Sequence, residues 1–215
     1  MPDEDEIPEY LRTQTERFVE NIVRVKRLIN LHSVLAGIAA DIAAHSGYDA
    51  SDVLRSAVVL LHATLEDLLR TIASAHLPRS DSEFIKKIPL AGMPRSGKYT
   101  IADLVQHRGK TIDAVLDESI NQWLETHSFN HAADVQGILT ELGMPVDYFA
   151  QNYEKLDQMI KRRHLIVHRA DRRNDGAANP ITPDEVKFWA ENVDEFMRRM
   201  IYQLQFVPHK PDESK

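Results

Sequence analysis

The chain has no cysteine among its 215 residues, and this absence excludes several kinds of chemistry. Disulfides, thiolate metal sites and a cysteine nucleophile cannot occur. Any bound metal would need histidine or carboxylate ligands. A chain without cysteine also fits a reducing compartment.

Long hydrophobic runs are missing as well. No apolar stretch approaches the roughly 20 residues of a membrane span, and the acidic start Met1-Pro-Asp-Glu-Asp-Glu does not have the basic and then apolar order of a secretory signal. We therefore expect a soluble, cytoplasmic protein with no membrane partner. Hydrophobic residues make up 43% of the sequence, which is enough for a chain of this length to bury a proper core.

The chain has no excess of positive charge. Its formal net charge of -7 argues against a protein that coats nucleic acid nonspecifically, because overall attraction to phosphate is absent. Basic residues are nevertheless concentrated between residues 161 and 173, where Asp171 stands alone against Lys161, Arg162, Arg163, Arg169, Arg172 and Arg173. An acidic body with one basic segment predicts a local anion site.

The apolar residues repeat with a helical period almost everywhere, and no alternating run is long enough for a strand. We predict an all-α fold, an up-and-down bundle of about six to eight helices. Residues 1–7 are expected to form a disordered acidic tail, 8–207 a single domain, and 208–215 a second disordered tail. No internal repeat or low-complexity segment interrupts this organisation.

Apolar stripes and capping signals place the elements along the chain. Helices are expected at about 8–45, 52–76, 101–108, 111–127, 130–142, 147–169 and 183–207, with a turn at 47–51 and a loop at 78–98 that contains one short helical piece. Polar Asn30, His32 and Ser33 suggest a break in the first helix. Trp123 and Trp189 lie on apolar stripes and are expected in the core.

The most informative segment is Lys161-Arg162-Arg163-His164-Leu165-Ile166-Val167-His168-Arg169. Arg163 falls where the stripe of its helix requires an apolar residue, and a cation on such a face is costly unless something compensates it. On an ideal helix, Arg163 and His168 lie roughly 140° apart, whereas His164 and His168 share one face.

The run from Arg163 to His168 resembles the R-x(4–6)-H signature of the HEPN superfamily, in which the residue after the arginine is typically Asn, Asp or His. The motif also lies near the end of a late helix that one further helix follows, as in that family. Two other stretches, 62–69 and 128–143, resemble segments of the RiboL-PSP branch. This resemblance implies a HEPN-like bundle.

The resemblance also implies an activity, which is metal-independent RNA cleavage by a homodimer with motifs from both copies in one cleft. Such cleavage leaves a 2′,3′-cyclic phosphate. Arg163 would clamp the phosphate, His168 would handle the proton, and His164 would support the site. An imidazole and an always-charged guanidinium suit these tasks.

Further residues complete the expected site. The neighbouring basic side chains Arg162, Arg169 and Arg172 would contact RNA. Two residues of the second long helix, Glu66 and His62, would support the residues of the motif. Neither a cofactor nor a metal is expected. The family includes toxins and defence effectors, so an antitoxin or another regulatory partner is a further expectation.

One position departs from a subgroup of the family. In HEPN toxins that a partner nucleotidyltransferase silences, a tyrosine stands two residues beyond the motif histidine. Ala170 occupies that position in this chain. Silencing by that route is therefore put in doubt, and a different partner or an RNA trigger stays open.

The residues leave other interpretations open. Arginines at a helix end often only complement its negative pole, and Arg163 could form a salt bridge with Glu66. The histidine pairs His164/His168 and His127/His131 have a metal-compatible spacing but no third ligand nearby. A noncatalytic RNA-binding or protein-interaction module, or a small-nucleotide-binding bundle, would account for such a motif without cleavage.

Overall fold

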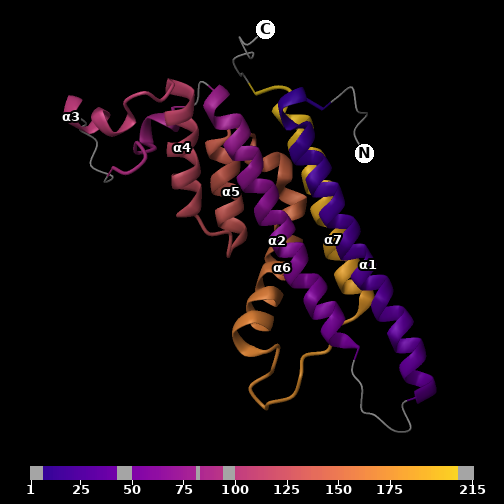
Figure 1. Ribbon diagram of the computed structural model, residues 1–215. Coiled ribbons are helices and arrows are strands. Elements are labelled where there is room, and N and C mark those ends of the chain that lie inside the picture. Colours follow the sequence, from indigo (N-terminus) through magenta and orange to yellow (C-terminus); the bar gives the residue numbers. More distant parts are fainter. Residues whose placement is uncertain (1–6, 43–49, 81–82, 94–99, 208–215) are drawn as a thin grey trace.

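The computed structural model describes residues 7–42, 50–80, 83–93 and 100–207, and these form an all-α bundle (Figure 1). The described helices are α1 (Arg12–Ile42), α2 (Ser51–His76), α3 (Ile101–Leu104), α4 (Ile112–Glu125), α5 (Ala132–Glu141), α6 (Ala150–Arg169) and α7 (Pro183–Leu204). Short 3-10 turns are η2 (Glu9–Leu11), η3 (Leu77–Arg79), η4 (Ile85–Lys87), η5 (Val105–His107) and η6 (Val146–Phe149). The predicted fold class is confirmed. In the part of the chain that the structure describes, no residue lies in a β-strand, and Arg172 and Ala178 form an isolated antiparallel bridge.

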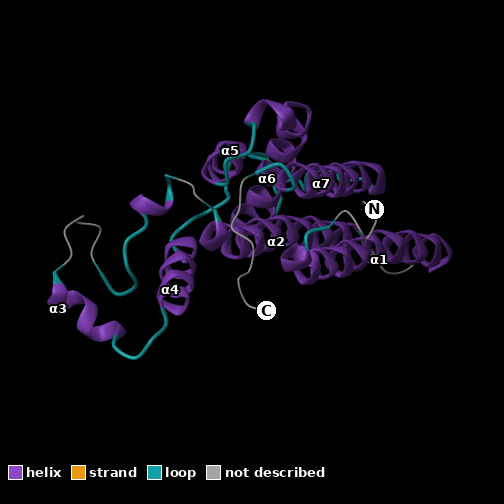
Figure 2. Cartoon of the chain, turned by 90° about the horizontal axis from the view of Figure 1, so that it is seen from above, coloured by secondary structure: helices purple, strands orange, loops and turns teal. Residues whose placement is uncertain are grey.

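The long helices form two layers, which the view from above makes clear (Figure 2). Helices α1 and α2 lie side by side in one layer, and α6 and α7 lie in the other, with contacts between α2 and both of them. Helix α3 lies apart from this bundle in both views (Figures 1 and 2). The end of α6 is therefore positioned by α2.

Helix α1 continues through the segment where the sequence suggested a break, so that prediction is wrong. Asn30 and Ser33 are exposed, and the Ser33 hydroxyl donates to the Ile29 carbonyl at 3.5 Å, one turn back. Polar side chains on a solvent-facing side leave the helical hydrogen bonds intact. They therefore do not end the helix.

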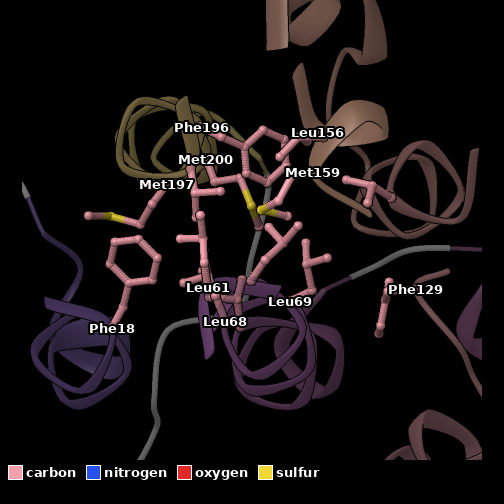
Figure 3. Close-up of a cluster of buried hydrophobic side chains, with 14 of the residues drawn as sticks. Phe18, Leu61, Leu68, Leu69, Phe129, Leu156, Met159, Phe196, Met197 and Met200 are labelled. Carbon is pink, nitrogen blue, oxygen red and sulfur yellow. The ribbon is translucent and has the colours of Figure 1, made fainter. Parts of the chain in front are cut away.

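The core is centred on α2, as its stripe predicts (Figure 3). The six stripe residues are at most 1% exposed: Leu54, Val58, Leu61, Leu65, Leu68 and Ile72. Figure 3 shows Leu61 and Leu68 of α2 facing Phe196 and Met200 of α7. Truncating one such leucine to alanine costs about 2–5 kcal/mol, because a cavity replaces its contacts.

The ends of the shorter helices follow the predicted signals. The Thr111 hydroxyl accepts from the Ala114 amide at the start of α4. Gly109 and Gly143 both adopt positive φ, 84° and 75°, which glycine tolerates best. Helix α5 begins at Ala132, two residues later than expected, because His131 provides the N-cap.

Helix α7 begins where the sequence predicts, and it holds α6 in place. The Thr182 hydroxyl accepts from the Glu185 amide at 3.2 Å, and the Glu185 carboxylate accepts from the Thr182 amide at 2.9 Å. Farther along, the buried Asn152 amide group of α6 donates to the Asn192 side-chain oxygen of α7 at 2.9 Å. Trp123 and Trp189 are buried, as expected.

Some predictions concern segments outside the described residues. These are the two tails, apart from Ile7, and most of the turn at 47–51. The loop at 78–98 is described only in part, and its short helical piece appears as η4.

Candidate functional site

The residues of the R-x4-H motif occupy the last two turns of α6, on different sides of the helix. Arg163 is partly buried and close enough to His62 of α2 for its charge to act on that imidazole. His164 and His168 are exposed, and their ring centroids lie 4.5 Å apart. The two histidines thus share one face, and Arg163 points elsewhere.

Arg163 has no hydrogen bond or ion pair with any described residue, and its Nε atom is buried without a partner. The salt bridge with Glu66 that the sequence left open is not formed. Glu66 instead accepts from Arg70 Nη2 at 2.8 Å and lies 3.9 Å from His62 Nδ1. A guanidinium that no carboxylate of the described chain neutralises can receive an anion from outside.

Arg70 outcompetes Arg163 for Glu66 because it is anchored nearby. It stands four residues after Glu66 on α2, a spacing at which helical side chains meet. Its guanidinium also donates to the backbone carbonyls of Leu124 and His127 at the end of α4, and lies 5.2 Å from the Phe129 ring centroid. Glu66 is therefore committed to a structural junction of α2 and α4.

His62 lies behind Arg163 and is only 2% exposed. Its Nε2 donates to the Phe129 carbonyl at 2.9 Å. Burial lowers the pKa of His62 below its ordinary value, and the charge of Arg163 lowers it further, against the opposing effects of the Phe129 carbonyl and Glu66. A neutral His62 avoids a second positive charge beside Arg163.

This lowered pKa predicts a pH-dependent stability. An unfolded histidine titrates near 6.5, so between that pH and the lower pKa of folded His62 the unfolded chain binds the additional proton. The free energy of unfolding should therefore fall as the pH drops below about 6.5.

Thermal unfolding between pH 5 and 8 checks this prediction. The variant His62→Gln, whose amide can still donate to the Phe129 carbonyl, should flatten the acid side of the profile. The variant His131→Gln, at an exposed position, should keep the parent's dependence of stability on pH. Identical profiles for the parent and both variants would refute the assignment of this dependence to His62.

Arg162 is held by a buried carboxylate. Asp171 is fully buried and accepts from Arg162 Nη2 at 2.8 Å and from Arg55 Nε of α2 at 2.8 Å. Although burial acts to lower it, the bonds with Asp171 and Asp52 raise the pKa of Arg55 above its ordinary value. Arg162, expected to contact substrate, thus has much of its hydrogen-bonding capacity occupied within the chain.

Arg169 and Arg172 are exposed at the end of α6 and in the loop that follows. Arg169 Nη2 donates to the Asn174 side-chain oxygen at 2.8 Å, and Arg172 Nη1 donates to the Gly176 carbonyl at 2.8 Å. Both side chains keep donors free because a guanidinium has five. They lie on the same chain segment as His168.

A groove of about 560 Å³ runs between α2 and the end of α6. It is lined by Asp52, Arg55, Ser56, Val59, Leu60, Ala63, Ile166 and Ala170. Arg163 lies one turn before Ile166 on the same side of α6, since residues three apart are neighbours on a helix. Val167, which follows Ile166 in α6, is 48% exposed.

Sequence reasoning missed the importance of Asp171 and Arg55. The isolated position of Asp171 among basic residues was a usable signal, because a lone acid there can pair with several arginines. No local pattern identifies Arg55, which lies 116 residues away in the chain.

Metal and membrane partners each require a recognisable feature of the chain. Among the described residues, no group of three or more histidine, aspartate or glutamate side chains could hold a metal ion. Within the same part of the chain, no helix has the length and apolar character needed to cross a membrane.

The family model described as RiboL-PSP-HEPN matches residues 20–205. The match extends from within α1 to the residue that follows α7, and so spans the whole of α6. The chain therefore belongs to the RiboL-PSP-HEPN family, within the all-α HEPN superfamily that the sequence resembles. Comparison with curated proteins and with solved structures found no match.

Proposed function

We propose that the chain is a HEPN-type endoribonuclease that cleaves RNA without a metal ion, as a homodimer whose active sites combine residues of both copies. One observation carries the proposal. The end of α6 has a partly buried guanidinium, Arg163, to which no described residue supplies a counter-ion, and two exposed imidazoles in contact, His164 and His168. These are the groups needed to bind a phosphodiester and to move a proton.

The proposed reaction uses the RNA's own 2′-hydroxyl. His168 takes the proton of this hydroxyl, whose oxygen forms a bond with phosphorus while the bond between phosphorus and the 5′-oxygen breaks. The leaving oxygen receives a proton from water, and the products are a 2′,3′-cyclic phosphate and a 5′-hydroxyl. Arg163 stabilises the negative charge that grows on the phosphate oxygens, and His164 supports His168 across the 4.5 Å ring contact.

The placement of the motif favours assembly from two copies. Arg163 faces α2 and the histidines face solvent, so a single protomer does not direct both groups at one phosphate. A two-fold axis near α6 would place Arg163 of one copy opposite His168 of the other. The groove beside Ile166 and the exposed Val167 contribute apolar surface to this face, and the cores of interfaces are apolar.

The exposed arginines extend the site along the RNA. Arg169 and Arg172 would bind phosphates flanking the scissile one, since guanidinium groups pair well with phosphate. Arg162 would act mainly through its bonds to the loop, because Asp171 and the Pro180 carbonyl occupy its Nη2. Glu66 and His62 would support the site through α2.

We further propose that the protein acts in the cytoplasm as a toxin or defence effector, held inactive until needed. An RNase must be restrained, and Ala170 in place of the tyrosine of one toxin subgroup argues for another regulatory partner or an RNA trigger.

The proposal predicts RNA cleavage in the presence of a chelator. Purified protein should cut labelled single-stranded RNA in excess EDTA and leave a 2′,3′-cyclic phosphate, identified by its resistance to phosphatase until acid opens the ring. DNA of the same sequence, and RNA with a 2′-O-methyl group at the cut position, should stay intact because the nucleophile is missing. Cleavage only after addition of divalent ions would overturn the metal-free mechanism. RNA binding without any cleavage would favour the noncatalytic RNA-binding module.

A further inference from the structure

The chain takes an unfavourable backbone path directly after the motif. Ala170 and Asp171 have φ values of 49° and 55°, and they are the non-glycine residues with positive φ in the described ranges. A Cβ atom disfavours this left-handed region, and two such residues in succession persist only where their surroundings fix them. The strain begins two residues after His168.

Backbone hydrogen bonds fix part of this turn. The amides of Ala170 and Asp171 both donate to the Leu165 carbonyl, the second at 3.0 Å. These bonds fold the chain back onto the last turn of α6, as in other helix C-caps that use the left-handed region. Glycine is the usual residue at such a position, so the backbone alone does not explain why this sequence adopts the turn.

The Asp171 carboxylate supplies the missing stabilisation. It accepts from Arg55 Nε and Arg162 Nη2, both at 2.8 Å, and from the Asn179 side-chain amide at 3.2 Å. The same arginines reach the opposite end of the loop: Arg55 Nη2 donates to the Asn179 carbonyl at 3.0 Å, and Arg162 Nη2 to the Pro180 carbonyl at 2.8 Å. The carboxylate thus joins the end of α6, the returning loop and α2.

We propose that Asp171 is a positioning residue of the ribonuclease site. Its bonds to Arg55 and Arg162 hold the chain in the left-handed turn. The turn sets the direction in which the last residues of α6, His168 and Arg169, face the RNA and the second copy. This inference rests on the proposed function. Asp171 itself is buried and touches no substrate.

The test compares Asp171→Asn with Asp175→Asn. Asparagine preserves the volume and tolerates the left-handed region, but it removes the negative charge between two guanidinium groups. Asp175 is in the same loop, with its side chain 63% exposed and 3.5 Å from Arg173, so it controls for loss of an acid near the site. Arg55→Lys is a second route to the same effect from α2, because it keeps the charge and loses the forked geometry.

The first readout is hydrogen exchange of the Ala170 and Asp171 amides, which requires no enzymatic activity. In Asp171→Asn, and less so in Arg55→Lys, exchange of these amides should be at least about tenfold faster, while amides in the core of α7 stay as in the parent protein. Unchanged exchange in both variants would overturn the proposal, whatever the protein does to RNA.

The second readout is RNA cleavage. A displaced His168 should lower kcat by at least about tenfold, because small misplacements are costly in catalysis, with little change in KM. Asp175→Asn should cleave like the parent. Faster exchange with unchanged kcat would show that the turn positions nothing and would also overturn the proposal. A parent protein without cleavage would refute the proposed function instead, and hydrogen exchange would still report on the turn.

Discussion

Replacing Arg163 with alanine is expected to lower the rate of RNA cleavage about 100- to 1000-fold, the usual effect of removing one preorganised group from a developing negative charge. Folding stability should change little. No described residue forms a hydrogen bond or ion pair with Arg163, so the substitution leaves no buried partner unsatisfied. Initial cleavage rates and urea unfolding of the same preparations measure the two effects.

Arg198→Ala is the matched control for this prediction. Arg198 lies on α7 and forms an i,i+4 ion pair with Asp194 at 2.9 Å, so its removal deletes a charge that plays no part in the proposed site. Its cleavage rate should stay within about threefold of the parent, because Arg198 lies outside the proposed site. If the parent protein does not cleave RNA and Arg163→Ala loses much of its folding stability, the role of Arg163 is purely structural.

Replacing His168 with alanine should lower the cleavage rate about 100- to 10,000-fold, the range for loss of a general acid or base. His168 is exposed, and its ring contacts only that of His164 among the described aromatic side chains. The thermal unfolding midpoint should therefore stay close to that of the parent. Cleavage assays and calorimetry across a pH series check both statements.

His164→Ala and His131→Ala provide graded controls for His168. His164 supports the neighbouring ring, so its removal should cost less than that of His168, by about one order of magnitude. His131 is exposed at the start of α5, and its removal should leave the rate unchanged. Equal losses in His164→Ala and His168→Ala would contradict the assignment of the proton transfer to His168.

The fold could be predicted from the sequence because the signals that form it are local. The leucine stripe of α2 repeats at helical spacing, and the capping box at Thr182 lies within four residues of chain. The prediction of a break in α1 was wrong for a related reason. Local polarity at Asn30 and Ser33 cannot distinguish a helix interruption from a solvent-facing side of a continuous helix, which packing decides.

The candidate site was predictable only in part. The positions of Arg163, His164 and His168 around α6 follow from helical geometry. The partners of each charge do not, because they come from distant segments: Glu66 is held by Arg70, and Asp171 is joined to Arg55 across 116 positions of sequence. Only the tertiary arrangement shows that none of the described carboxylates forms an ion pair with Arg163.

The central claim is that each active site takes Arg163 from one copy and His168 from the other, and mixing two inactive variants tests it most directly. Arg163→Ala and His168→Ala are unfolded together in equal amounts, refolded, and assayed for RNA cleavage. Random pairing makes half of the dimers mixed, and each mixed dimer has one intact site, so about one quarter of the parent activity should return. Recovery at that level, absent from either variant alone, is the predicted result. If size-exclusion chromatography shows mixed dimers and no activity returns, the shared site is contradicted.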